Sequence, residues 1–214
     1  MKVLVVGANG QIGRHIVELL KGKNDFTGIA MVRNEEQAAA FREKGVEAVL
    51  ADLEGSVDEL TEAMEGCDAV IFTAGSGGHT GADKTLLIDL DGAVKTIEAA
   101  ELAKVNRFIM VSALQANNRE NWNEKIKHYY AAKHYADKAL LQSSLNYTIV
   151  RPGGLVNEAG TGNINAGEII ERGVIPRADV ARTVVECLKE EHTYNKSFDL
   201  VSGGTPIQEA LQRI

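Results

Sequence analysis

Hydrophobic and polar positions follow two patterns along the chain, short apolar runs and longer amphipathic stretches. Short β-branched runs are typical of strands buried in a parallel sheet, and apolar residues every three or four positions are typical of helices that cover it. Strands are expected near residues 2–6, 28–32, 46–50, 69–73, 107–111, 146–150 and 197–201, and helices near 11–22, 35–44, 56–65, 84–104, 123–143 and 178–190. This alternation predicts an α/β fold, a doubly wound parallel sheet of about seven strands.

The alternation loosens in the last third of the chain. Residues 152–176 are rich in glycine, are bounded by two prolines and show little periodicity. They could form a solvated loop, but they follow the carboxyl end of a predicted strand, where ligands of open α/β sheets bind. We therefore expect a small excursion on the substrate side of a single domain that spans residues 1–214.

The first fourteen residues, MKVLVVGANGQIGR, combine a buried strand, a turn with three glycines and the start of an amphipathic helix. Gly7 permits a sharp turn, Gly10 lets a pyrophosphate approach the backbone, and Gly13 lets the helix pack closely on the sheet. The free N–H groups at the helix start then face the phosphates. The alternative is an ordinary strand-to-helix turn. The expected dinucleotide-binding residues here are Gly7, Asn9, Gly10, Gln11, Ile12, Gly13 and Arg14.

Composition narrows the possible partners and the compartment. The net charge is −7 and there is no run of lysine or arginine, so nucleic acid is not an expected partner. No apolar stretch reaches the length of a membrane helix, and the N-terminus enters a strand without the features of a signal peptide. We expect a cytoplasmic protein that acts on a small molecule; homo-oligomerisation stays open.

Neither the cysteines nor the histidines predict a metal site. Cys67 and Cys187 are far apart and lack the neighbouring ligands of a zinc site. None of the histidines has partners at metal-binding spacing, so each is expected to be solvated rather than catalytic. They are His15, His79, His128, His134 and His192.

The end of the second predicted strand indicates which dinucleotide is bound. A site for NAD normally has a carboxylate there, to bind the adenosine ribose, but this chain has Arg33. Arg14 adds a second guanidinium on the same side, and a guanidinium can hold a 2′-phosphate by charge-assisted hydrogen bonds. NADP is therefore favoured over NAD. The alternative is that both arginines are solvated surface charges.

Three further strand ends contribute expected cofactor contacts. Asp52 and Leu53 close the third strand, where the aspartate is placed to contact the adenine amino group. Small residues after the fourth strand let the backbone run close to a ribose and diphosphate. The backbone after the sixth strand could line the nicotinamide, or form an ordinary proline turn. These two segments are Ala74, Gly75 and Ser76, and Pro152, Gly153, Gly154 and Leu155.

Together these motifs resemble the short-chain dehydrogenase/reductase superfamily, in its atypical NmrA-like and biliverdin-reductase-like branch. The resemblance covers nearly the whole chain and implies an NAD(P)-binding Rossmann fold. The matching motifs are Gly7-x-x-Gly10-x-x-Gly13, Asp52-Leu53, Thr73-Ala74-Gly75, Val111-Ser112, Tyr129-x-x-x-Lys133 and Tyr147-Thr-Ile-Val-Arg-Pro-Gly153.

The resemblance also implies a reaction centre of a serine, a tyrosine and a lysine, which match Ser112, Tyr129 and Lys133. The superfamily often adds an upstream asparagine, at whose position Asp91 stands. The four-residue spacing places Tyr129 and Lys133 on one helix face, where the ammonium is expected to lower the phenol pKa for proton transfer. Ser112 would hold the substrate oxygen. Alternatively, Tyr129 is a packing residue and Lys133 only binds the cofactor ribose.

Three functions remain open. The first is an NADP-dependent oxidoreductase acting on a small or planar carbonyl-type substrate. The second is a non-catalytic NADP-binding redox sensor, as the NmrA-like resemblance implies. The third is an NAD(P)-dependent epimerase or dehydratase of nucleotide sugars, although little of the chain follows Pro152 to form a lobe for a nucleotide sugar.

Overall fold

The computed structural model describes residues 1–78 and 80–214, so the expectation for His79 lies outside the described residues. Within them, nine strands form one sheet in the order β11-β8-β10-β6-β5-β4-β1-β2-β3. The seven strands from β3 to β10 are parallel to one another. At the β10 edge, β8 pairs antiparallel with β10, and β11 pairs antiparallel with β8. The Rossmann-like α/β fold expected from the sequence is confirmed.

The bounds of the elements follow the expected alternation for most of the chain. The strands are β1 (Lys2–Val6), β2 (Thr27–Val32), β3 (Glu47–Leu50), β4 (Ala69–Phe72), β5 (Arg107–Val111), β6 (Asn146–Pro152), β7 (Gly154–Val156), β8 (Asn163–Gly167), β9 (Val174–Pro176), β10 (Lys196–Ser202) and β11 (Thr205–Pro206). The helices are α1 (Gln11–Lys21), α2 (Glu35–Arg42), α3 (Val57–Ala63), α4 (Ala82–Lys84), α5 (Gly92–Leu102), α6 (Lys127–Gln142), α7 (Arg177–Glu186) and α8 (Ile207–Leu211). Shorter helical turns are the π-helical η1 (Thr85–Asp91) and the 3₁₀ turns η2 (Arg119–Asn121), η3 (Glu124–Ile126) and η4 (Glu191–Thr193).

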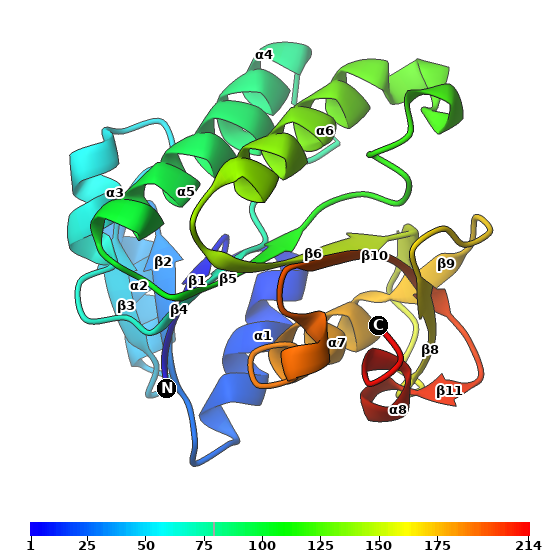
Figure 1. Cartoon of the computed structure of the whole chain (residues 1–214). Helices are drawn as coiled ribbons and strands as arrows, with labels where there is room; N and C mark the ends of the chain where they lie inside the picture. Colours follow the sequence, from blue (N-terminus) through cyan, green and yellow to red (C-terminus); the bar gives the residue numbers. More distant parts are fainter. Residues whose placement is uncertain (79) are drawn as a thin grey trace.

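Helices cover both faces of the sheet and bury a separate apolar core on each (Figure 1). One core joins α1, α2, α7 and α8 to the sheet through residues such as Ile16 and Val184. The other joins α3, α5 and α6 through residues such as Leu60, Ile97 and Leu140. The central strands are therefore buried on both sides, which is why they read as continuous apolar runs.

The last third of the chain holds more strands than expected. The estimate of about seven strands is too low, because β8 and β11 extend the main sheet and β7 pairs with β9 in a separate two-stranded sheet. Three of these additional strands, β7, β8 and β9, lie in the 152–176 excursion. Strands of two to five residues at an edge bury little surface, so their sequences lack a clear hydrophobic period.

Two expected helices also differ from the structure. The helix expected over 84–104 is three consecutive elements, α4, the π-helical turn η1 and α5. The helix expected over 123–143 begins at Lys127, after the 3₁₀ turn η3. Within the described residues, no helix combines the length and the apolar composition needed to cross a bilayer. In the same residues no group of three metal-ligating side chains is placed to hold an ion.

The turn between β1 and α1 has no room for a side chain at Gly13. A Cβ added there would lie 2.2 Å from the Gly7 carbonyl oxygen and 2.8 Å from the Ala8 Cα. We expect Gly13→Ala to lower the free energy of unfolding by about 1–3 kcal/mol, the usual cost of overpacking. Urea denaturation followed by circular dichroism measures this difference.

Gly22, at the other end of α1, is the matched control. Its φ is −75°, in the right-handed helical region, and the nearest atoms to an added Cβ are 3.7 Å away. Gly22→Ala should therefore leave stability unchanged or raise it by about 0.4–1 kcal/mol. If Gly13→Ala were as stable as Gly22→Ala, the close packing of this turn would be refuted.

Candidate functional site

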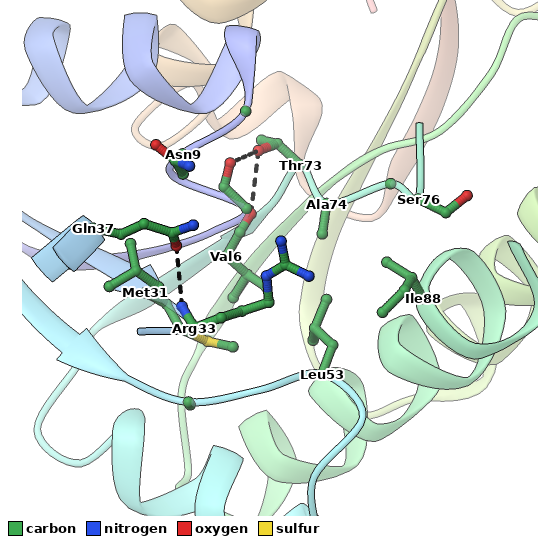
Figure 2. Close-up of a pocket in the computed structure, with 15 residues that line it drawn as sticks. Val6, Asn9, Met31, Arg33, Gln37, Leu53, Thr73, Ala74, Ser76 and Ile88 are labelled. Atoms are coloured by element: carbon green, nitrogen blue, oxygen red, sulfur yellow. Dashed lines mark hydrogen bonds between the residues drawn. The ribbon is translucent and has the colours of Figure 1, made fainter. Parts of the chain in front are cut away.

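The first of two cavities opens where the strand order of the sheet reverses. Going from β1, the chain adds β2 and β3 on one side and β4 and β5 on the other. At such a switch point the connections leave in opposite directions, and ligands bind outside the carboxyl ends of the strands. A cavity of about 310 Å³ lies there, lined by residues from the ends of β1, β2 and β4 (Figure 2).

The glycine turn forms one wall of this cavity. Gly7 has a φ of +83°, and an added Cβ would lie 2.6 Å from the Ala74 nitrogen, so the position requires glycine. Gly10 immediately precedes α1 and is extended, and its position as the N-cap provides no side chain to cap the helix. The first N–H groups of α1 are thus left for a ligand, and the helix dipole favours an anion. This geometry fits the pyrophosphate of a dinucleotide.

About half of the expected cofactor contacts line this cavity. They come from the glycine turn, the end of β2 and the segments after β3 and β4. They are Gly7, Asn9, Gly10, Arg33, Leu53, Ala74, Gly75 and Ser76.

Seven lining residues were missed. Most immediately precede or follow an expected contact at a strand end, so a wider window there would have found them. Gln37 follows Arg33 by four residues, and in the structure its side chain accepts a hydrogen bond of 3.3 Å from the Arg33 nitrogen. Ile88 has no local signal, because it lies in the π-helical turn η1. The missed residues are Val6, Met31, Val32, Gln37, Ala51, Thr73 and Ile88.

The two arginines expected at the 2′-phosphate are placed differently. The Arg33 side chain extends across the cavity, with its guanidinium pointing towards Ala74 (Figure 2). Arg14 does not line the cavity; its Nη2 instead donates a hydrogen bond of 2.8 Å to Asn9 Oδ1. Arg33 therefore presents the cation directly, whereas Arg14 orients the Asn9 amide that lines the cavity.

Beyond Arg33 lies a second, more acidic cavity of about 350 Å³. Asp52 lines this second cavity together with Glu59 and Glu62, and does not line the first. Its Oδ1 accepts a hydrogen bond of 3.0 Å from the Glu54 nitrogen, which holds the turn after β3. Arg33 is shared by the two cavities, so it separates the acidic surface from the cavity beside the glycine turn.

The other expected cofactor residues do not line the first cavity, the one beside the glycine turn. Gln11, Ile12 and Gly13 belong to the first turn of α1, where Ile12 packs into the core. Around Pro152 the backbone groups are largely engaged in the sheet. The Pro152 carbonyl accepts a hydrogen bond of 2.9 Å from the Leu114 nitrogen, and the Gly153 nitrogen donates one of 2.9 Å to Leu200. The segment expected to line the nicotinamide is Pro152, Gly153, Gly154 and Leu155.

Tyr129 and Lys133 lie together on α6, beside the wall formed by the segment after β4. Lys133 is buried, and its Nζ is 5.7 Å from the centre of the Tyr129 ring. The same Nζ lies 3.5 Å from the carbonyl oxygens of Ala74 and Val111. The lysine thus connects the cavity wall to the tyrosine.

The carboxylate beside Lys133 is Asp89, whereas the resemblance has Asp91 at the position of the superfamily's asparagine. Asp89 Oδ1 lies 3.3 Å from Lys133 Nζ, and both side chains are almost fully buried. Asp91 is exposed and forms a 3.1 Å ion pair with Lys95. The physical reason is the π-helical turn η1, whose wider turn changes which side chains face inward. A sequence pattern with a period of 3.6 residues does not reveal that change.

The phenol of Tyr129 behaves opposite to the sequence expectation. Burial raises its pKa, and the Lys133 ammonium lowers the pKa only in part, while the Asp89 carboxylate adds to the rise. Burial works to lower the pKa of Lys133, but Tyr129 and Asp89 outweigh it and the pKa is raised. The expectation that Lys133 lowers the phenol pKa overall is therefore wrong. Tyr129 carries its proton at neutral pH and can donate it.

Ser112 lies at the end of β5 and is buried beside a second ion pair. Arg151 Nε donates a hydrogen bond of 2.8 Å to Asp137 Oδ2, and both side chains are almost fully buried. The Ser112 hydroxyl lies next to Asp137, where it helps to offset the rise that burial causes in the carboxyl pKa, although it forms no hydrogen bond of standard geometry. Tyr129, Lys133 and Asp137 follow one another at four-residue spacing, on one face of α6.

Comparisons with known proteins identify the family of the chain. The profile of the NAD(P)H-binding family matches residues 7–191. The uncharacterized sugar epimerase YhfK of Bacillus subtilis is 61% identical over 100% of both chains. The UPF0659 protein YMR090W of Saccharomyces cerevisiae is 41% identical, over 100% of this chain and 99% of its own.

A solved structure from Bacillus halodurans, provisionally described as an NAD-dependent epimerase/dehydratase, is also similar. It is 45% identical, covers 100% of both chains and has a TM-score of 0.94. The glycine turn, the cavity at the strand-order reversal and these relatives lead to one conclusion. The chain belongs to the NAD(P)H-binding family of Rossmann-fold proteins.

Proposed function

We propose that the protein is an NADP-dependent oxidoreductase that reduces a small or planar carbonyl compound. The observation that carries this proposal is the buried Lys133 between the wall of the nucleotide cavity and Tyr129, 3.5 Å from the Ala74 carbonyl oxygen. A sensor of the cofactor needs no proton donor at that position. A reductase needs one beside the nicotinamide.

The preference for NADP rests on Arg33. Its guanidinium lies in the cavity at the end of β2, where a carboxylate would accept hydrogen bonds from the ribose of NAD. A guanidinium offers two parallel N–H donors to a phosphate and would leave them without an acceptor on a bare ribose. The acidic groups beyond Arg33 make an unpaired phosphate unfavourable there, so binding of the 2′-phosphate depends on this one side chain.

The proposed chemistry divides the work between cofactor and protein. When bound, the nicotinamide supplies the hydride that reduces the carbonyl carbon. Tyr129 donates its hydroxyl proton to the carbonyl oxygen, so that hydride and proton together convert the carbonyl to an alcohol. Lys133 holds the phenol in place and would bind the ribose, and Ser112 would orient the oxygen. The phenolate of Tyr129 then recovers a proton from solvent.

A sugar epimerase is the second candidate, because the name of the Bacillus subtilis relative describes that activity. Epimerisation through a keto intermediate needs Tyr129 as a base first, and the raised phenol pKa works against this. The two functions differ in stoichiometry. A reductase consumes one NADPH for each product formed, whereas such an epimerase regenerates its cofactor in every cycle.

Removing the Arg33 guanidinium should weaken NADP binding selectively. Loss of a hydrogen bond to a charged group costs about 1.5–3 kcal/mol, so Arg33→Ala should raise the Kd for NADP by about 10- to 100-fold. The Kd for NAD should change little. Isothermal titration of both nucleotides measures the difference, and thermal unfolding with each nucleotide provides an independent check.

Arg42 is the matched control for Arg33. It is an exposed arginine on α2, paired with Glu35, and it lines neither cavity. Arg42→Ala should bind both nucleotides as the parent does. Equal affinity of the parent for NAD and NADP, or an unchanged NADP affinity in Arg33→Ala, would rule out the arginine as the discriminating residue.

Replacing the Tyr129 hydroxyl should abolish most of the activity while leaving the cofactor bound. General acid catalysis contributes about 100- to 10,000-fold, so Tyr129→Phe should lower kcat by at least about 100-fold. The assay follows NADPH oxidation with quinones, flavins, tetrapyrroles and aldehydes. The parent substrate found in this screen is then used for the variants.

Tyr135 provides the control on the same helix, because its side chain is exposed and hydrogen bonds to Arg119. Tyr135→Phe should keep the parent kcat, and both variants should keep the parent Kd for NADPH. A Tyr129→Phe enzyme as active as Tyr135→Phe would remove the phenol from the mechanism.

A further inference from the structure

Asp89 is a buried carboxylate to which the proposed chemistry assigns no role. Its Oδ2 accepts a hydrogen bond of 2.9 Å from the Ser76 nitrogen, and its Oδ1 faces Lys133 Nζ at 3.3 Å. Only 1% of the residue is exposed. Asp89 thus joins the π-helical turn η1 to the cavity wall after β4 and to α6.

The segment after β4 also restricts the position of the Asp89 side chain. A Cβ added to Gly75 would lie 3.0 Å from Asp89 Oδ1, so the backbone after β4 packs directly on the carboxylate. Ser76 Oγ also lies 3.3 Å from Thr85 Oγ1, one turn before Asp89. The segment after β4 therefore holds the carboxylate in place against the lysine.

Burying this ion pair is costly, so it calls for an explanation other than stability. Replacing a buried pair by apolar residues of similar volume is often neutral or stabilising, because both charges lose their hydration. Asp89 and Lys133 are buried as a pair within 4 Å, and Lys133 also contacts the proposed proton donor. The pair therefore acts on the charge state of its surroundings.

The titratable groups around the lysine come from two elements. Asp89 faces it from η1, and Tyr129, Tyr130 and Asp137 belong to α6 with the lysine itself. Asp137 is paired with Arg151, so its charge is offset locally. Asp89 and Lys133 are left to set the local charge at the phenol.

The charge balance of this group decides the state of Tyr129. With the carboxylate present, the pair is neutral as a whole, and a phenolate would add an uncompensated negative charge in a buried place. Without the carboxylate, loss of the phenol proton would leave a phenolate paired with the Lys133 ammonium. The phenol then loses its proton at a lower pH, because one repelling negative charge has been removed.

We propose that Asp89 is a positioning residue that holds Lys133 in the buried pair and keeps the Tyr129 hydroxyl protonated, so that the centre is set to donate a proton. This inference rests on the proposed function in that the proton is donated to the carbonyl oxygen of a compound that is reduced by hydride. The charge state itself is a property of the free protein. It can be measured without substrate or cofactor.

The direct test is the titration of Tyr129 in Asp89→Asn, a variant that keeps the shape and removes the charge. Tyrosinate absorbance is recorded against pH, and the same titration in a Tyr129→Phe background is subtracted to remove the other four of the five tyrosines. A neighbouring charge typically shifts a titration by about one to three pH units. We expect the Tyr129 signal in Asp89→Asn to appear at least about one pH unit lower than in the parent.

Asp91→Asn is the matched control, because Asp91 is the exposed aspartate two residues away and pairs with Lys95. It should leave the Tyr129 titration unchanged. If the Tyr129 phenol titrates at the same pH in Asp89→Asn as in the parent and in Asp91→Asn, the proposal is overturned. This result would leave the oxidoreductase function standing, since no enzyme assay enters it.

A second comparison tests the proposal if the Asp89→Asn variant does not fold. The Lys133→Met variant keeps the Asp89 carboxylate but removes its cationic partner, and the double variant with Asp89→Asn removes both charges together. The Tyr129 phenol should titrate at lower pH in the double variant than in Lys133→Met, because the repelling carboxylate is gone. The same phenol titration in both variants would overturn the proposal as well.

Kinetics of the active enzyme provide a separate readout. At high pH the reduction loses its proton donor, so kcat falls there. In Asp89→Asn this fall should begin at least about one pH unit lower than in the parent, with a change in kcat rather than in the Kd for NADPH. A uniform loss of kcat at every pH, with an unmoved profile, would indicate a merely structural residue and contradict the proposal.

Discussion

The close approach of two backbone segments determines where the site forms. Gly7, at the end of β1, packs against Ala74, so tightly that an added Cβ would lie 2.6 Å from the Ala74 nitrogen. Thr73 strengthens this approach, since its nitrogen donates a hydrogen bond of 2.9 Å to the Val6 carbonyl. Because β1 and β4 are adjacent where the strand order reverses, the same contact closes one end of the cavity. Lys133 contacts the same segment, because its Nζ lies 3.5 Å from the Ala74 carbonyl oxygen.

Much of the fold and of the nucleotide end follows from local sequence patterns. The strands β1 and β5 have the bounds expected from their sequences. A strand buried on both faces is recognisable because its residues form a continuous apolar run. The three glycines are readable because their roles are local, within one turn. The strands β8 and β11 are not readable from the sequence, since their pairing partners are distant in the sequence and these short strands bury little surface. Lining residues such as Ile88 depend on how a distant helical turn packs, which no window of sequence contains.

The pair of Tyr129 and Lys133 shows a second limit of sequence-based prediction. The spacing of Tyr129 and Lys133 places the ammonium near the phenol, and a positive charge alone lowers a phenol pKa. The sequence contains no sign that a carboxylate from η1 faces the same ammonium, because the π-helical turn brings Asp89 inward in place of Asp91. Burial also raises the pKa of the Tyr129 phenol, and how deeply the phenol is buried depends on the whole fold. The direction of a pKa in a buried cluster is therefore a tertiary property.

The position of Tyr129 follows from how α6 is held against the sheet. The apolar residues of this helix that reach the core are small or few, with Ala136 and Leu140 as the main contacts. Its buried face also carries two charges, of opposite sign, at Lys133 and Asp137. Each is paired with a group fixed by a different element, the lysine with η1 and the aspartate with Arg151 on β6. A rotation of α6 about its axis would separate both pairs at once and leave four buried charges without partners, at a cost of several kcal/mol for each broken pair. Two ion pairs of low net stability thus fix the orientation of the helix, and with it the position of the Tyr129 phenol.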